Sequence, residues 1–198
     1  MKLDSNHPSK IIKELAEWLA DELLFELSEY EYEPQSILDT REIFRIKAAD
    51  FTQELIEKKI DNLPQNKELA FHSILRYNKK KYHIPMIDFQ APESTIRESI
   101  RSLERVIPKS IFNELVFYNS GRSCHAYSLR IISNSEWIDF MGRLLLVSHP
   151  NEKQIIDTRW IGHRLMSGFS SLRWSANTGQ YLAVPKKIKM HPTIKQPF

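Results

Sequence analysis

A short polar turn between two β-prone runs constrains the fold of this chain most strongly. The turn occupies residues 118–127, contains Ser-Gly-Arg-Ser-Cys-His, and lies between the apolar runs 115–117 and 129–132. This pattern predicts a hairpin. A glycine-containing turn can direct backbone N–H groups, a guanidinium and a hydroxyl at a phosphate, with the imidazole of His125 nearby. The alternative is an ordinary hairpin in which His125 is a hydrogen-bonded, half-buried residue.

The remaining hydrophobic pattern divides the chain into helices and strands. Helical periodicity predicts helices over residues 8–29, 48–60, 93–106 and 134–147, and alternation or short apolar runs predict strands over 40–46, 69–76, 82–89 and 154–157. Residues 77–81 separate two of these strands and predict a second hairpin. The inward stripe of the first helix includes Trp18, Leu23 and Leu27, and that of the last includes Leu144 and Leu145.

The length and the order of these elements predict one α/β (α+β) domain. A chain of 198 residues is long enough for one well-buried domain, but not for two of full size. We expect a mixed, largely antiparallel central sheet flanked by helices. Residues 1–39 are expected to form an amphipathic N-terminal helical segment packed on the core, and residues 40–198 the main part of the domain.

Two aspartates stand at the ends of short apolar runs. Asp88 follows Met86-Ile87, and Asp157 follows Ile155-Ile156. A carboxylate in such a place is costly unless it is paired, hydrogen-bonded or bound to a cation. Downstream basic groups suit a polyphosphate and aromatic groups suit base stacking, although aromatic residues at this spacing are commonly core. These residues are Arg159, His163, Arg164, Arg173 and Ser175, with Trp160, Phe169, Trp174 and Tyr181.

Charge and cysteine content limit the functional classes. A net charge of +3 does not by itself identify a nucleic-acid binder, and the lysine clusters at 79–81 and 186–189 read as solvated loops. The single cysteine, Cys124, excludes an internal disulfide and a cysteine-based zinc site, and fits the reducing cytoplasm. On an alternating strand Cys124 and His125 point to opposite faces, so Cys124 is expected in the core. The apolar runs are too short to span a bilayer, so no membrane association is expected.

Three of these segments together resemble the ordered motifs of the archaeo-eukaryotic primase (primase-polymerase) superfamily. Residues 86–89 are similar to its hydrophobic strand with Asp-x-Asp or Asp-x-Glu, residues 120–125 to its Ser-Gly-x-x-x-His turn, and residues 155–157 to its later hydrophobic-Asp motif. Residues 40–44 resemble an Arg-Glu-Phe segment near the start of the catalytic primase subunit, and residues 172–175 a basic segment after the third motif. The resemblance covers roughly residues 40–185.

The resemblance implies a primase-polymerase-like fold and template-directed synthesis of short RNA or DNA strands from nucleoside triphosphates. Asp88 and Asp157 would hold Mg²⁺ or Mn²⁺, with His125 completing the catalytic set, and all three are expected on one face of the sheet. The nucleotide phosphates would be bound mainly by the turn, with Arg173 as a charge clamp. The implied nucleotide-binding residues are Ser120, Gly121, Arg122, Ser123, Arg173 and Ser175. DNA or RNA templates and a separately encoded helicase or accessory subunit are the expected partners.

One departure from the family pattern leaves two functions open. Gln90 stands where the family has its second acid, and an amide adds no charge to a cation site. Glu93 is the nearby acid that would have to substitute for it. The first function is an active nucleotidyltransferase. The second is a catalytically weakened nucleotide- or nucleic-acid-binding module, acting as an accessory or sensor subunit in mobile-element replication or anti-phage defence.

Overall fold

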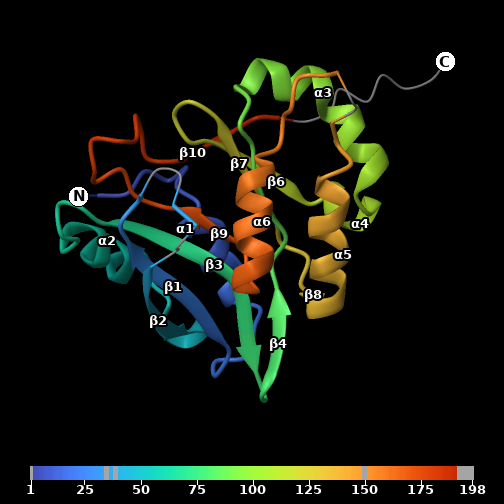
Figure 1. Cartoon of the computed structure of the whole chain (residues 1–198). Helices are drawn as coiled ribbons and strands as arrows, with labels where there is room; N and C mark the ends of the chain where they lie inside the picture. Colours follow the sequence, from blue (N-terminus) through green and yellow to red (C-terminus); the bar gives the residue numbers. More distant parts are fainter. Residues whose placement is uncertain (1, 34–35, 38–39, 149–150, 191–198) are drawn as a thin grey trace.

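The computed structural model describes residues 2–33, 36–37, 40–148 and 151–190, and its strands form two sheets (Figure 1). The six-stranded sheet has the order β2-β1-β3-β4-β8, with β9 also paired to β3. The four-stranded sheet has the order β10-β6-β7-β5. Their bounds are β1 Leu24–Tyr30, β2 Arg41–Lys47, β3 Glu68–Tyr77, β4 Lys80–His83, β5 Met86–Asp88, β6 Leu115–Asn119, β7 Cys124–Ser128, β8 Ile132–Ser133, β9 Ser171–Arg173 and β10 Lys186–Ile188.

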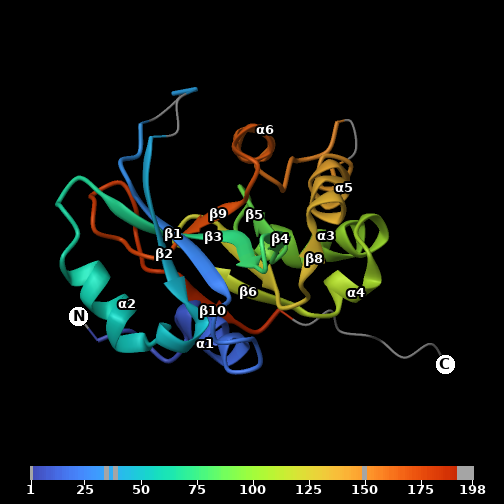
Figure 2. The same cartoon turned by 90° about the horizontal axis from the view of Figure 1, so that it is seen from below.

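The helices cover both ends of this pair of sheets. They are α1 Ser9–Ala16, α2 Gln53–Asp61, α3 Glu93–Val106, α4 Lys109–Phe112, α5 Asn134–Leu144 and α6 Thr158–Ser167, with a 3₁₀ turn, η1, at Ala48–Asp50. Figures 1 and 2 show α3, α4 and α5 gathered at one side, α1 and α2 at the other, and α6 between them. The α+β class with antiparallel sheets and flanking helices is therefore confirmed, but the strands belong to two sheets rather than to one central sheet.

The N-terminal segment is only partly helical. α1 ends at Ala16, Trp18 is 87% exposed, and the second half of the predicted helix is strand β1. β1 pairs with β2 and β3 along its two edges, and the consecutive residues 25–28 are buried, so both of its faces are covered. The prediction of one helix over residues 8–29 was therefore wrong beyond α1. The spacing of Leu23 and Leu27 fits a helix, but it fits a doubly buried strand equally well.

Pro85 separates two strands that the sequence pattern had joined. The predicted hairpin is confirmed for β3 and β4, which pair in register, and Asn78 and Lys79 adopt the positive φ values that a tight hairpin turn requires. The chain then changes sheets at Ile84-Pro85, because proline has no N–H to donate to a ladder. Residues 86–88 form β5 beside β7 in the second sheet. The prediction of one strand over residues 82–89 was wrong in this respect.

Several element ends differ from the sequence prediction. The predicted helix over 48–60 begins as α2 only at Gln53, where the Thr52 hydroxyl accepts a hydrogen bond from the Leu55 N–H. α5 begins at Asn134, as predicted, and its N-cap Ser133 forms a capping box with Glu136. Leu145, however, lies outside the helix and is 46% exposed. α3 has the predicted bounds.

The segment predicted as a strand at residues 154–157 makes one isolated bridge, between Phe89 and Ile156. The lysine-rich segment at 186–189, predicted as a loop, supplies strand β10 at the edge of the second sheet.

The core has two hydrophobic clusters. One joins α1 and α2 to the six-stranded sheet, and the other joins α3, α4 and α5 to the four-stranded sheet. Trp160, in α6, packs against both clusters. Cys124 is fully buried, as predicted. Among the described helices, none has both the length and the apolar character needed to traverse a bilayer.

Candidate functional site

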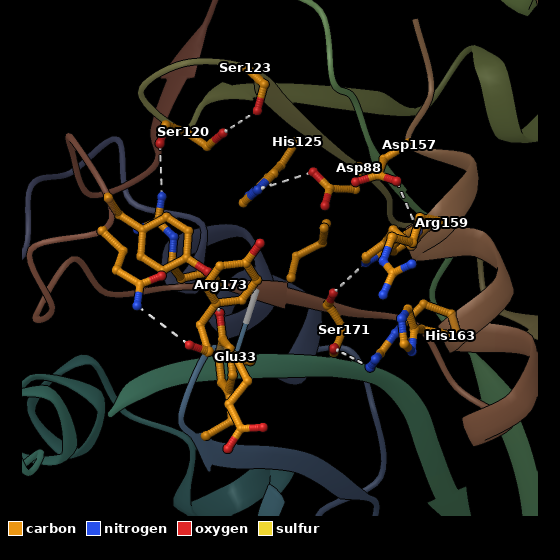
Figure 3. Close-up of a pocket in the computed structure, with 18 of the residues that line it drawn as sticks. Glu33, Asp88, Ser120, Ser123, His125, Asp157, Arg159, His163, Ser171 and Arg173 are labelled. Atoms are coloured by element: carbon orange, nitrogen blue, oxygen red, sulfur yellow. Dashed lines mark hydrogen bonds and ion pairs between the residues drawn. The ribbon is translucent and has the colours of Figure 1, made fainter. Parts of the chain in front are cut away.

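A cavity of about 690 Å³ opens where the two sheets meet. It is lined by the end of β1 and the residues after it, by β5, by the turn between β6 and β7, by α6, by β9 and by residues 180–182. Its volume lies in the range of small-molecule sites. Asp88, His125 and Asp157 all line it, together with Ser120, Arg122, Ser123 and Arg173 (Figure 3). Most of the residues that the sequence predicted as a site are thus brought to one cavity.

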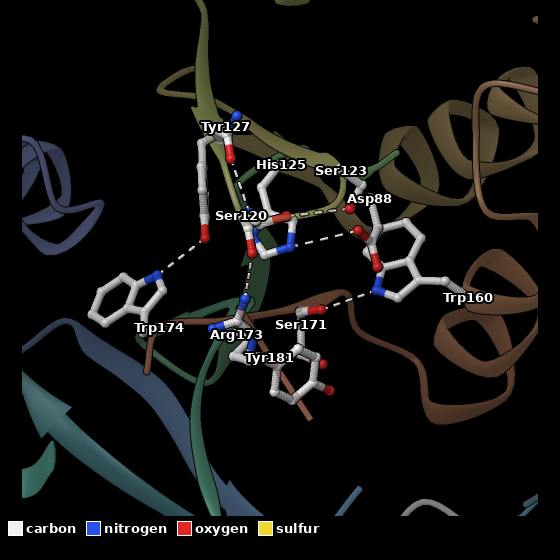
Figure 4. A network of polar contacts seen from close by, with 12 residues as sticks. Asp88, Ser120, Ser123, His125, Tyr127, Trp160, Ser171, Arg173, Trp174 and Tyr181 are labelled. Carbon is white, nitrogen blue, oxygen red and sulfur yellow. Dashed lines mark hydrogen bonds and ion pairs between the residues drawn. The ribbon is translucent and has the colours of Figure 1, made fainter. Parts of the chain in front are cut away.

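Asp88 and His125 face each other across neighbouring strands. The two residues are partners in the β5–β7 ladder, and His125 Nε2 lies 3.5 Å from Asp88 Oδ1 (Figure 4). Burial, and secondarily the Arg173 guanidinium, lower the pKa of His125 to about 3. The imidazole is therefore neutral at pH 7. Its Nδ1 is buried and has no hydrogen-bond partner in the described part of the chain.

Asp157 is attached to the same strand end through the backbone. Its N–H donates to the Asp88 carbonyl oxygen at 3.1 Å, and its Oδ1 accepts from the Trp160 N–H at 2.9 Å, so that Asp157 is the N-cap of α6. Burial and then the Asp157 carboxylate raise the pKa of Asp88 to about 8, although Arg173 and Arg164 act in the opposite direction. The Asp88 carboxyl group therefore largely retains its proton at pH 7.

The turn between β6 and β7 is held by its own polar groups. The Ser120 N–H donates to the Ser123 carbonyl at 2.9 Å, and the two hydroxyls lie 3.2 Å apart. Gly121 has φ +116°, and a Cβ there would lie 3.2 Å from the Leu182 Cβ, so the position needs glycine for both reasons. Gly121 itself is not a lining residue. Arg122 is exposed at the cavity and makes no hydrogen bond or ion pair that the structure records among the described residues.

Arg173 lines the cavity, but its donors are directed at backbone carbonyls. Its Nη2 donates to the Ser120 carbonyl at 2.8 Å, and its Nη1 donates to the carbonyls of Ala183, at 3.1 Å, and of Ser175. The guanidinium carbon lies 4.0 Å from the centre of the Tyr181 ring. Arg173 therefore joins the 120–123 turn to the loop that follows β9. Three of its N–H groups are thereby engaged within the fold, and the expected role of Arg173 as a phosphate clamp stays a prediction.

Three further residues predicted for the site lie outside the cavity. The Ser175 hydroxyl is buried, accepts from the Leu69 N–H at 2.8 Å and donates to Glu68. The Gln90 amide donates to the carbonyl and the side-chain oxygen of Gln154, at 3.1 and 3.2 Å. Glu93 forms an ion pair with Arg97. Gln90 lies outside the cavity because β5 ends at Asp88 and the chain beyond it pairs with residues 155–157.

Other cavity residues were not assigned to the site from sequence. Arg159 and His163 were noted as basic, and the spacing of four residues between them is the signal that could have placed them on one face of a helix. Tyr30 was missed because the preceding residues of β1 were predicted as helix. Arg41 lies in the segment that resembles the family's Arg-Glu-Phe pattern, but it was given no role in the site. The Arg41 guanidinium lies 4.2 Å from the Tyr30 ring centre.

The described residues offer few ligands for a metal ion. They contain no group of three or more His, Cys, Asp and Glu side chains placed to hold one. Burial, and then the neighbouring Asp157 carboxylate, raise the pKa of Asp88, so a cation beside these two groups would be favourable. The unpartnered Nδ1 belongs to the imidazole that contacts Asp88. A divalent cation can be bound by one or two carboxylates, with water and substrate phosphates completing its shell. Asp88 and Asp157 therefore fit one cation, and within the described ranges no third His, Cys, Asp or Glu is grouped with them for a second.

One comparison with known protein families gives a match, and it covers the candidate site. The family model AEP-like, described as archaeo-eukaryotic primase 1D-like, matches residues 47–186, which include β5, the 120–123 turn and Asp157. No curated protein and no solved structure gives a significant match. The family match extends over more than half of the chain and contains all three residues that meet at the end of the cavity. The chain therefore belongs to the archaeo-eukaryotic primase 1D-like family.

Proposed function

We propose that this chain is a nucleotidyltransferase of the primase-polymerase type, which joins nucleoside triphosphates to the end of a short RNA or DNA strand on a template. The observation that carries the proposal is the meeting of Asp88, His125 and Asp157 at one end of a nucleotide-sized cavity. These residues come from two strands and a helix start, far apart in sequence. Asp88, His125 and Asp157 are the proposed catalytic residues.

The triphosphate would lie against the turn between β6 and β7. Arg122 offers a guanidinium at the cavity surface, and the Ser120 and Ser123 hydroxyls offer short-range donors. His125 is neutral, so it can donate one hydrogen bond to a phosphate oxygen without bringing a second positive charge next to Arg173. In this proposal Gly121 and Arg173 shape the turn rather than touch the nucleotide.

The cation expected in this family is proposed to bind between Asp88 and Asp157. When bound, Mg²⁺ or Mn²⁺ would offset the charge of the triphosphate and of the carboxylate pair. Binding requires Asp88 to release its proton, so affinity should increase as the pH rises toward 8. With two carboxylates instead of three, we propose one firmly held cation, with Mn²⁺ preferred because its coordination is less demanding than that of Mg²⁺.

Primer extension and de novo priming assays, each with Mg²⁺ and with Mn²⁺, test the proposal. We expect slow synthesis that is faster with Mn²⁺ and is lost in Asp88→Asn and Asp157→Asn. Asparagine is suitable at both positions because it retains hydrogen bonding, and at Asp157 it also preserves the helix cap. Asp139→Asn on α5 is the matched control, since Asp139 is exposed and pairs with Arg143 outside the cavity. Synthesis that persists in both cavity variants would refute the proposed centre.

A second candidate function is a nucleotide- or nucleic-acid-binding module without synthesis, working with a separately encoded helicase or accessory subunit. The observation that favours it is the absence of a third carboxylate beside Asp88 and Asp157 among the described residues. Nucleotide binding that depends on Arg122, together with no strand extension in either metal, would select this function.

Replacement of His125 tests the nucleotide site in both cases. We expect His125→Ala to weaken nucleoside triphosphate binding by about 1–3 kcal/mol, because a buried donor to a phosphate is removed. Calorimetric titration measures the affinity, and thermal melting monitors the fold. Unchanged affinity in a folded variant would reject the site. A large loss of thermal stability with unchanged affinity would identify His125 as a core residue only.

A further inference from the structure

Two sets of basic side chains in the cavity lie on opposite sides of the aspartates. One set is Arg122, with the serines of the 120–123 turn. The other is on α6, where Arg159 and His163 both line the cavity. Figure 3 shows Ser120 and Ser123 on one side of Asp88 and Asp157, and Arg159 and His163 on the other. If one triphosphate binds at the 120–123 turn, Arg159 and His163 on α6 have no assigned ligand.

The α6 set has the spacing and chemistry of a phosphate site. Residues four apart on a helix are neighbours on one face, so the Arg159 guanidinium and the His163 imidazole can contact the same anion. Arg159 also donates to the Ser36 carbonyl at 3.0 Å, which holds its side chain near the cavity rim.

The geometry of phosphoryl transfer assigns a ligand to this second set. The attacking and leaving oxygens lie roughly in line with the transferred phosphorus, and therefore on opposite sides of it. If the pyrophosphate leaves toward the 120–123 turn, the attacking hydroxyl approaches from the α6 side. We propose that Arg159 and His163 bind the last phosphodiester of the nucleic-acid strand whose 3′ end is extended. This inference rests on the proposed nucleotidyl transfer and adds a separate strand-end subsite to it.

The test measures binding of a labelled single-stranded oligonucleotide by fluorescence anisotropy, without turnover. We expect Arg159→Ala and His163→Ala each to weaken this binding about tenfold, the effect of removing one charge-assisted hydrogen bond. The affinity for a nucleoside triphosphate should stay within about twofold of wild type. Arg122→Ala should give the reverse pattern. Arg101→Ala removes the same charge from the exposed face of α3, away from the cavity, and is the matched control.

A second oligonucleotide locates the bound phosphate on the strand. A neutral methylphosphonate at the last 3′ linkage should weaken oligonucleotide binding by the wild-type chain. It should have no further effect on the affinity of the Arg159→Ala, His163→Ala double variant. In the wild type, the same change in the middle of the strand should lower the affinity less. The double variant should also lower the slope of log affinity against log salt by about 0.7, because one phosphate is no longer neutralised. If Arg159→Ala lowers the melting temperature because its hydrogen bond to Ser36 is removed, His163→Ala alone decides the result.

The outcomes separate this inference from the proposed function. Oligonucleotide binding that is unchanged in the α6 variants, or weakened equally by Arg101→Ala, overturns the strand-end subsite. Equal effects of the terminal and the central methylphosphonate also overturn it. Those results leave nucleotide binding at Arg122 and His125 untouched. By contrast, a wild-type chain that binds the oligonucleotide but no nucleoside triphosphate would refute the proposed nucleotidyl transfer itself.

Discussion

Arg173 shows how an arginine beside a cavity can serve the fold. Its hydrogen bonds go to three backbone carbonyls on two segments, and its guanidinium stacks on Tyr181. The residue is buried. Its role is therefore to hold the 120–123 turn against residues 175–183, which also explains why Leu182 approaches Gly121 so closely. Arg122, which is exposed in the same turn, is the residue left to meet a ligand.

Arg173→Ala and Arg122→Ala should consequently have different effects. We expect Arg173→Ala to reduce the free energy of unfolding by about 3–5 kcal/mol, because buried carbonyls lose charged donors. Arg122→Ala should change it by less than about 0.5 kcal/mol and should weaken triphosphate binding. Urea denaturation and calorimetric titration measure the two quantities. A stable Arg173→Ala protein whose nucleotide affinity is reduced as much as that of Arg122→Ala would identify Arg173 as a phosphate ligand.

Gln90 is the second residue whose position changes an expectation. Its family counterpart is an acid, so the sequence suggested that this amide weakens a cation site. In the structure the amide is exposed and donates to Gln154, outside the residues that line the cavity. We expect Gln90→Glu neither to strengthen Mn²⁺ binding nor to raise strand extension, since the new carboxylate would replace a donor facing two acceptors. Tighter Mn²⁺ binding in a calorimetric titration would show that this side chain turns toward Asp88.

At the scale of elements, the loop after β9 depends on one buried carboxylate. Glu68, at the start of β3, accepts hydrogen bonds from the Asn177 N–H, the Thr178 N–H and the Thr178 hydroxyl, and from Ser175. The bonds made by the Thr178 groups are 2.7 Å long. The same loop brings the Tyr181 hydroxyl to 3.4 Å from that of Tyr30, which lines the cavity. Glu68 thus fixes one cavity wall without touching the cavity.

Glu68→Gln should therefore be costly although it is isosteric. An amide must direct its own N–H groups at the loop donors, so we expect a loss of about 2–4 kcal/mol in unfolding free energy. Nucleotide affinity should decrease as well, because the cavity wall loosens. Glu98→Gln, on the exposed face of α3, is the control in both denaturation and binding measurements. An unfolding free energy equal to that of wild type would mean that the loop is held by Arg173 alone.

At the scale of the whole molecule, buried neutral histidines tie stability to pH. Burial lowers the pKa of His7 and of His83 to about 4. His83 Nε2 must donate to the Asn134 side-chain oxygen, so its Nδ1 accepts from the Ser73 hydroxyl. Below pH 6.5 these imidazoles become protonated in the unfolded chain but stay neutral in the folded protein. Each one therefore costs stability as the pH falls from about 6.5 to about 4.

The variant His83→Gln isolates this effect from the other titrating groups. We expect the dependence of unfolding free energy on pH to become less steep by about 1 kcal/mol per pH unit between pH 6 and 4.5. Asp88, whose pKa is raised, acts in the opposite direction, but its contribution is common to both proteins. Urea denaturation across this pH range gives the two slopes. Parallel curves for wild type and His83→Gln would mean that His83 is protonated in the folded protein.

The sequence by itself determined those features that depend on local periodicity and on short motifs. The bounds of α3, the start of α5, the β3–β4 hairpin and the burial of Cys124 all follow from spacing or from residue preference. The motif order also placed Asp88, His125 and Asp157 in one candidate site. Such signals are legible in a single sequence because each depends on neighbours within a few residues.

The tertiary structure decided what depends on partners distant in sequence. The Leu23–Leu27 spacing suits a helix or a doubly buried strand, and only pairing with β2 and β3 makes it β1. Pro85 ends one ladder, but the pairing of β5 with β7 in the second sheet depends on residues that are distant in sequence. Arg173, Ser175 and Gln90 were assigned to the site by motif. In the structure Arg173 donates to backbone carbonyls, Ser175 donates to Glu68, and Gln90 donates to Gln154. Hydrogen-bonding groups satisfy the nearest available partners once the chain is folded, and no local pattern specifies those partners.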